Sequence, residues 1–134
     1  MYNNNAGQVR IFRFDTNSNN WLQMGEDLDS ATSFSQFGHS ISLSADGSLI
    51  GIGAHPNHVQ VYRFDVDSND WIQMGKTLNG QADYDQFGWS VSLSPDGSTL
   101  AVGAIYNDES ALNSGSVQVF SISGKFINTI IITK

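Results

Sequence analysis

The 134-residue chain contains no cysteine, which excludes disulfides, thiolate catalysis and cysteine-ligated zinc. Basic residues are scarce: six Lys and Arg stand against thirteen Asp and Glu, and the formal net charge of -7 would repel a phosphate backbone. No apolar run is long enough to span a bilayer, and the N-terminal residues lack the pattern of a signal peptide. We therefore expect neither a nucleic-acid partner nor a membrane span.

Strong helix formers are also in short supply. Asn, Ser and Gly are plentiful while Ala, Leu, Glu and Lys are not, and this balance favours strands and turns over helices. The length suits one ordinary domain or part of one.

A long internal repeat is the clearest feature that is present. Residues 7–54 match residues 57–104 without a gap at roughly half of their positions. A third copy begins at "SVQVF" (116–120), which corresponds to "HVQVY" (58–62) after an insertion. The similarity is then lost in a tail without Trp. The chain is therefore built from copies of one structural unit.

Apolar residues within each copy alternate with polar ones at period two, as in "SISLS" and "SVSLS", which predicts strands. "VRIFRF" and "VQVYRF" are apolar on both faces, as in a strand covered on both sides. Short turns separate these runs: "SADGS" and "SPDGS" mark one hairpin, "DTNSNNW" and "DVDSNDW" a second.

These patterns predict an all-β fold of four-stranded antiparallel β-propeller blades, about two and a half in number, in an incomplete ring. A closed β-sandwich is the alternative. The predicted units are a partial blade at 1–30 with the last two strands, a blade at 34–79, and a blade at 84–134 with an inserted loop at 105–115. The predicted strands cover residues 8–15, 21–25, 37–44, 49–54, 58–65, 71–75, 87–94, 99–104, 116–122 and 126–133.

The repeated Phe-Gly and Gly-Ala pairs resemble the FG-GAP repeats of integrin α-chains. The matching residues are Phe37-Gly38 with Gly53-Ala54-His55-Pro56, and Phe87-Gly88 with Gly103-Ala104. The resemblance implies a β-propeller on an extracellular or cell-surface protein that serves as an adhesion or recognition platform. Calcium-binding members carry a longer, Asp-rich loop between the first two strands, whereas here that turn is the short "SADGS" or "SPDGS".

The repeat also predicts which residues form the structural core. A blade cannot bury both faces of its own sheet, so neighbouring blades must cover them. Large aromatic rings suit the space between sheets, and Gly suits crowded strands near the axis. The expected core residues are Trp21, Trp71, Phe37, Gly38, Phe87, Gly88, Gly53 and Gly103.

Two Asx-rich turns are the best metal candidates, because oxygen ligands at alternate positions can wrap calcium. The residues are Asp65, Asp67 and Asn69, echoed by Asp15, Asn17 and Asn19. The remaining positions of a calcium loop are not repeated, and hairpin turns explain both copies without a metal. We therefore expect no cofactor, with calcium as the alternative.

Three other chemical candidates are weak. His55 precedes a strand and His58 enters it, and Asp83 and Asp85 have serine counterparts in the other copy. "GHSIS" lacks the second Gly of a hydrolase elbow. The inserted loop could bind a cation or a partner through Asn107, Asp108, Glu109 and Asn113, but a solvated loop explains it as well.

The function expected from these observations is a non-enzymatic interaction or structural module that contacts a protein or glycan partner. The alternative is part of a larger propeller-based enzyme or lectin whose pocket is formed by other blades. Two and a half blades leave open sheet faces and strand edges. We therefore expect further blades or other subunits against residues 8–25 and 126–134.

Overall fold

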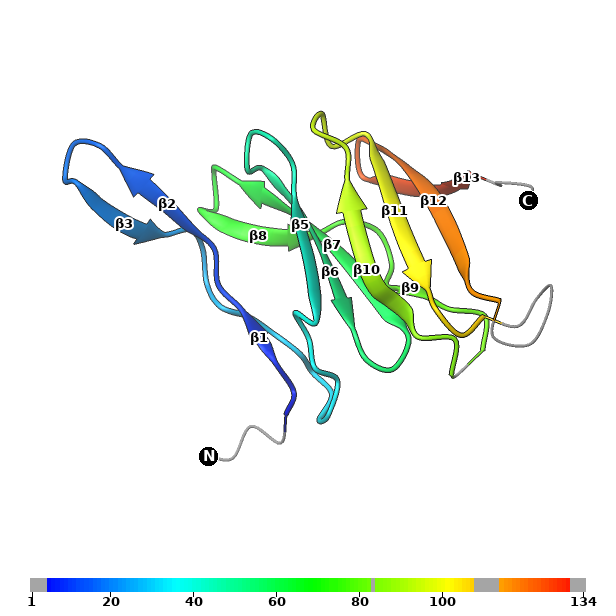
Figure 1. The fold of residues 1–134 in the computed structure, drawn as a ribbon. Coiled ribbons are helices and arrows are strands. Elements are labelled where there is room, and N and C mark those ends of the chain that lie inside the picture. Colours follow the sequence, from blue (N-terminus) through cyan, green and yellow to red (C-terminus); the bar gives the residue numbers. More distant parts are fainter. Residues whose placement is uncertain (1–4, 83, 108–113, 131–134) are drawn as a thin grey trace.

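The computed structural model describes residues 5–82, 84–107 and 114–130, and all of its regular elements are β-strands (Figure 1). Within these ranges no helix is long and apolar enough to cross a membrane. The strands form three successive units, which we call blades 1, 2 and 3. The fold class expected from the sequence is confirmed: all-β, with antiparallel sheets.

Blade 1 has short strands only, β1 (Gln8–Val9), β2 (Phe12–Asp15), β3 (Asn20–Gln23) and β4 (Leu28–Asp29). Blade 2 contains β5 (Ser40–Leu43), β6 (Leu49–Ala54), β7 (His58–Asp65), β8 (Asp70–Gln73) and β9 (Leu78–Asn79). Blade 3 contains β10 (Phe87–Leu93), β11 (Thr99–Ala104), β12 (Ser116–Ser123) and β13 (Phe126–Ile130). In Figure 1 the β2–β3 hairpin projects away from the rest of the molecule.

Blades 2 and 3 are four-stranded meanders with the orders β5-β6-β7-β8 and β10-β11-β12-β13. Blade 1 corresponds to the last two strands of such a meander: β1 and β2 take the place of β7, and β3 that of β8. The short β4 pairs with β1 (Val9 opposite Leu28) as β9 pairs with β7 (Val59 opposite Leu78). No described strand takes the place of β5 and β6 in blade 1.

The strand bounds differ from the sequence expectation at a few points. Residues 8–15 form two short strands, and the strand expected from residue 37 begins at Ser40, after left-handed backbone at Gln36 and Gly38. The two-residue strands β4 and β9 were not predicted, because two residues carry no alternation to detect. The strand expected at 126–133 is seen as far as Ile130, and its end lies outside the described residues.

The core lies between the blades in two clusters. Even-numbered residues of β6 face blade 1, where Ile50 and Ile52 pack with Val9 and Ile11. Odd-numbered residues of β7 face blade 3, where Val59 and Val61 pack with the side chains of β11 and β12. The central strands β6 and β7 are therefore covered on both sides, and this explains the apolar residues on both sides of β7.

The two Phe-Gly sites occupy equivalent positions. Phe37 and Phe87 are both almost fully buried. Gly38 has φ +91° and Gly88 has φ +92°, and a Cβ atom on either would lie within 2.9 Å of a valine Cγ2 in the preceding blade. Only glycine fits both the backbone conformation and this close approach.

The two Asp-Gly turns are held by the same hydrogen bonds. The Asp46 carboxylate accepts from the Ser44 hydroxyl, the Ser48 hydroxyl and the Ser48 backbone N–H, and these bonds lower its pKa from 3.8 to about 2. Ser94 and Ser98 lower the pKa of Asp96 to about 2 in the same way. Because the bonds favour the charged form, each turn is strongest while its carboxylate is ionised.

We predict that these two turns contribute to acid sensitivity. In the unfolded chain both carboxyl groups protonate near pH 3.8, whereas in the folded chain they do so near pH 2. Their stabilisation is therefore fully present above pH 3.8 and is lost as the pH falls to about 2. The double substitution Asp46→Asn and Asp96→Asn should flatten the dependence of the free energy of unfolding on pH in this window, measured by urea unfolding.

The control is Asp67→Asn, which removes the same charge from a different turn. Unchanged acid dependence in the double variant would contradict the assignment.

Candidate functional site

The Asx-rich turns predicted as metal candidates are closed by their own hydrogen bonds. The Asp15 carboxylate accepts from the Ser18 hydroxyl at 2.6 Å and the Ser18 N–H at 2.9 Å. Asp65 makes the same two bonds to Ser68 at 2.6 and 3.0 Å. In both turns these bonds lower the pKa of the aspartate.

The other residues of these turns complete the chain reversal. Asn19 and Asn69 adopt left-handed backbone at φ 52° and 53°, a conformation that Asn tolerates well. Asn17 lies in the turn that connects β2 to β3, and Asp67 in the turn that connects β7 to β8. No group of three or more His, Asp or Glu side chains suited to a metal ion occurs in the described part of the chain.

The remaining candidates have structural contacts. Asp85 is buried and accepts hydrogen bonds from the Asn107 side chain at 2.9 Å and the Ala82 N–H at 3.0 Å. It thereby links the loop before β10 to the start of the inserted loop. Asp83 and the other three inserted-loop candidates, Asp108, Glu109 and Asn113, lie outside the described residues.

The serine of the elbow-like sequence and the two histidines also lie in structural positions. The Ser40 hydroxyl donates to the Gly88 carbonyl at 2.7 Å and so joins blade 2 to blade 3. His58 opens β7, where burial lowers its pKa, and His55 lies in the turn before that strand.

The contact between blades 1 and 2 is centred on Trp71. Its side chain is only 5% exposed, and its indole N–H donates to the Met24 carbonyl at 2.8 Å. The Asp70 carboxylate accepts from the Glu26 N–H at 2.9 Å. A Cβ atom on Gly25 would lie 2.8 Å from the Trp71 ring, so the end of β3 is shaped to receive this indole.

Trp21, which the sequence places in the core, is instead 63% exposed. It keeps the local arrangement of Trp71: its ring packs edge-on against Phe14 at a centroid distance of 5.4 Å, as Trp71 packs against Phe64 at 5.3 Å. The difference is that blade 1 covers the Trp71 ring, whereas no described strand covers the Trp21 ring. For the same reason Phe12 and Phe14 of β2 are exposed, although two-sided burial was expected.

Strand β5 shows the same asymmetry. Leu43 is 46% exposed, whereas its counterpart Leu93 in β10 is 8% exposed. Ile41 is 56% exposed, and its counterpart Val91 packs against the core of blades 2 and 3. Blade 2 covers β10, but blade 1 has no inner strands with which to cover β5.

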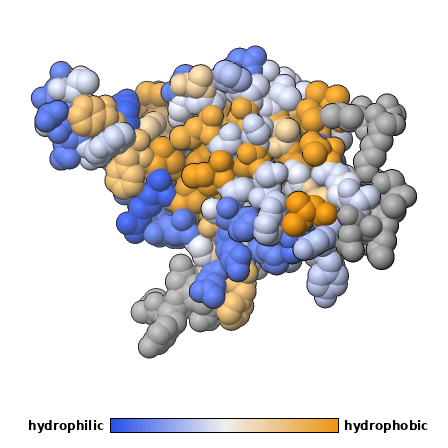
Figure 2. All heavy atoms as spheres, viewed as in Figure 1, coloured by the Kyte–Doolittle hydropathy of each residue, from blue (hydrophilic) through white to orange (hydrophobic). Residues whose placement is uncertain are grey.

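We call the exposed apolar residues that no blade covers the open face: Phe12, Phe14 and Trp21 of blade 1, and Ile41 and Leu43 of blade 2. Figure 2 shows apolar atoms gathered over the middle of the molecule, beside the protruding β2–β3 hairpin.

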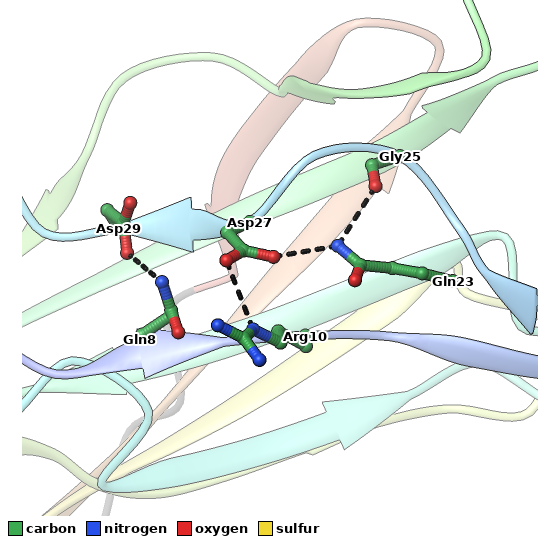
Figure 3. A network of polar contacts seen from close by, with 6 residues as sticks. All are labelled: Gln8, Arg10, Gln23, Gly25, Asp27 and Asp29. Carbon is green, nitrogen blue, oxygen red and sulfur yellow. Dashed lines mark hydrogen bonds and ion pairs between the residues drawn. The ribbon is translucent and has the colours of Figure 1, made fainter.

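A polar network holds blade 1 in shape (Figure 3). The Arg10 guanidinium contacts Asp27 at 3.0 Å, and the Gln23 amide donates to Asp27 at 2.7 Å. Gln8 donates to Asp29 at 2.8 Å, so that β1, β3 and β4 are tied together. The ion pair is partly exposed and contributes at most about 1 kcal/mol.

The two homologous tryptophans predict a large difference in stability. Trp71→Ala should lower the free energy of unfolding by about 3–5 kcal/mol, because it empties the contact between blades 1 and 2. Trp21→Ala should change it by less than about 1 kcal/mol, because the ring packs only on its own hairpin. Urea unfolding at low protein concentration measures both, and equal costs would contradict the proposed arrangement of blades.

Comparison with known proteins agrees with this geometry. Residues 71–120 match the FG-GAP repeat, a stretch that runs from Trp71 of β8 to Phe120 of β12 and includes the second Phe-Gly site. No curated protein matches the chain. The four-stranded blades and the sequence comparison lead to one assignment: the chain contains an FG-GAP repeat at residues 71–120.

Proposed function

We propose that this chain is a non-enzymatic interaction module whose open face binds a β-strand partner. The observation that carries the proposal is the contrast within the repeat: Trp71 and Leu93 are buried by a neighbouring blade, while Trp21 and Leu43 are exposed. The chain itself therefore supplies an example of what covers such a face.

The backbone next to the open face supports a polypeptide partner. In blade 2, β6 pairs with residues 58–63 of β7 along its inner edge. The equivalent edge of blade 1, residues 8–13, pairs with no described strand on that side. A partner that adds strands here would both complete the hydrogen bonds of the sheet and cover Ile41 and Leu43.

Burial of the open face would supply part of the free energy of binding. Fully burying one large apolar side chain contributes about 1.5–3 kcal/mol. The five residues of the open face are already about half buried, so each offers about half of that amount. The sum must also offset the entropy lost on association, so that apolar burial and strand pairing are both needed.

The proposal favours a protein partner over a glycan, because apolar side chains and an unpaired backbone edge are the features of β-strand recognition. It assigns no catalytic residue to this chain. The resemblance to integrin-type FG-GAP repeats extends the proposal to an adhesion-type or assembly role outside the cell or at its surface.

Self-association of the full chain tests the proposal. In the absence of a partner, the open face should drive concentration-dependent association, measured by light scattering after size-exclusion chromatography and by sedimentation. Trp21→Lys and Leu43→Lys should each shift the chain to the monomer, because a charge in the contact remains unpaired on burial.

The matched control is Val66→Lys, which alters an apolar residue that is 82% exposed in the β7–β8 turn. It should associate like the wild type. A wild-type chain that stays monomeric up to high concentration, or face variants that associate as well as the control, would overturn the proposal.

A further inference from the structure

A second surface, separate from the open face, lies between blades 2 and 3. It is a cavity of about 440 Å³ beside the end of β8 and the β12–β13 hairpin. This volume is within the range of ligand pockets, roughly 300–1,000 Å³. Its lining includes Arg63, Ile72, Met74, Gly75, Gly124 and Lys125.

The cavity exists because the contact between blades 2 and 3 is an incomplete copy of the contact between blades 1 and 2. In register, Ile127 takes the place of Trp71: Ile122 is opposite Ile127 as Phe64 is opposite Trp71. The turn between β7 and β8 spans residues 66–69, whereas that between β12 and β13 spans only 124 and 125. A smaller side chain on a shorter turn leaves space unfilled.

The glycine at the end of each outer strand shows this directly. A Cβ atom on Gly25 would lie 2.8 Å from both the Asp70 carboxylate and the Trp71 ring. A Cβ atom on Gly75, the equivalent residue, would meet nothing closer than Ile127 at 3.9 Å. The end of β8 at Gly75 therefore repeats the surface that receives Asp70 and Trp71 at Gly25, but blade 3 places no aspartate or indole against it.

The charges around the cavity suit an acidic ligand. Arg63 and Lys125 line it, and Lys76 follows Gly75, so that three of the six basic residues gather here in a chain of net charge -7. No carboxylate in the described ranges forms an ion pair with any of them. Asp65 also lines the cavity, but its carboxylate accepts the hydrogen bonds of Ser68.

We propose that this cavity binds an acidic–aromatic residue pair, Asp-Trp or a close equivalent, presented by a partner polypeptide. The aromatic ring lies on Gly75 between Ile72 and Met74, and its N–H donates to the Met74 carbonyl, as Trp71 donates to Met24. The carboxylate accepts from the Lys76 N–H, as Asp70 accepts from Glu26. Arg63 and Lys125 add charge that the contact between blades 1 and 2 does not use.

A polypeptide is the favoured occupant because the chain already demonstrates the binding mode with its own residues 70 and 71. The inference does not depend on the proposed function of the open face. The two surfaces involve different residues and their tests have different readouts, so either proposal can fail without the other.

The experiment is a titration of the full, isotope-labelled chain with the capped dipeptide Asp-Trp, followed by amide chemical shifts. We expect saturable shifts at Gly75, Lys76, Gly124 and Lys125. Capped Asn-Trp should bind about fivefold more weakly, because it lacks the charge that faces Arg63 and Lys125. Capped Asp-Ala should not saturate.

Two variants make the test specific. Ile127→Trp should place an indole on Gly75, as Trp71 lies on Gly25, and so abolish binding of the dipeptide while preserving the spectrum of the fold. Arg63→Gln should weaken Asp-Trp binding about fivefold, whereas Arg13→Gln, the equivalent change in blade 1, should have no effect. Absence of shifts at the four amides, or undiminished binding by Ile127→Trp, would overturn the proposal.

Discussion

The burial of one sheet face against the next blade is the constraint on which this structure depends. A four-stranded sheet with apolar residues on both sides cannot shield them from water by itself. The central strands of blade 2 meet the requirement on both sides, through Ile50 and Ile52 toward blade 1 and Val59 and Val61 toward blade 3. The Phe-Gly sites follow from the same requirement, since Gly38 and Gly88 admit a valine of the preceding blade.

The internal repeat lets the chain be compared with itself. Positions 50 residues apart carry the same side chain in different surroundings, so the effect of a neighbouring blade can be separated from that of the sequence. Trp71 and Trp21 show what a blade covers and what its absence exposes. Gly25 lies against Asp70 and Trp71 in the contact between blades 1 and 2, whereas Gly75 borders a cavity in the contact between blades 2 and 3.

Much of the fold could be predicted from the sequence, because strands and tight turns leave local signals. The alternation in "SISLS" and the Asp-Gly turns located β5, β6, β10 and β11 within a few residues. Strands β4 and β9 were not predicted, because their pairing depends on β1 and β7, which are distant from them in the sequence. The Phe-Gly pairs carried the family resemblance, and the comparison confirms an FG-GAP repeat over residues 71–120.

The two proposed binding surfaces could be predicted only in part. That a partial blade would leave an open face was foreseeable, but the exposure of Trp21 was not, because its local sequence, "SNNWLQMG", is nearly the same as "SNDWIQMG" around the buried Trp71. The cavity beside Gly75 depends on a shortened turn and on Ile127 in the position of a tryptophan, and this correspondence emerges only from the strand register. The metal candidates, by contrast, were alternatives to Asx turns, and the structure shows those turns closed by Ser18 and Ser68.

The most direct test of this account is the solvent exchange of the three indole N–H protons, measured by NMR on the monomeric chain. We expect the Trp71 proton, which is hydrogen-bonded to the Met24 carbonyl of blade 1, to exchange far more slowly than that of Trp21. Equal exchange at Trp21 and Trp71 would show that blade 1 does not cover blade 2, and would contradict the stacking of blades on which the structure and both proposed surfaces depend.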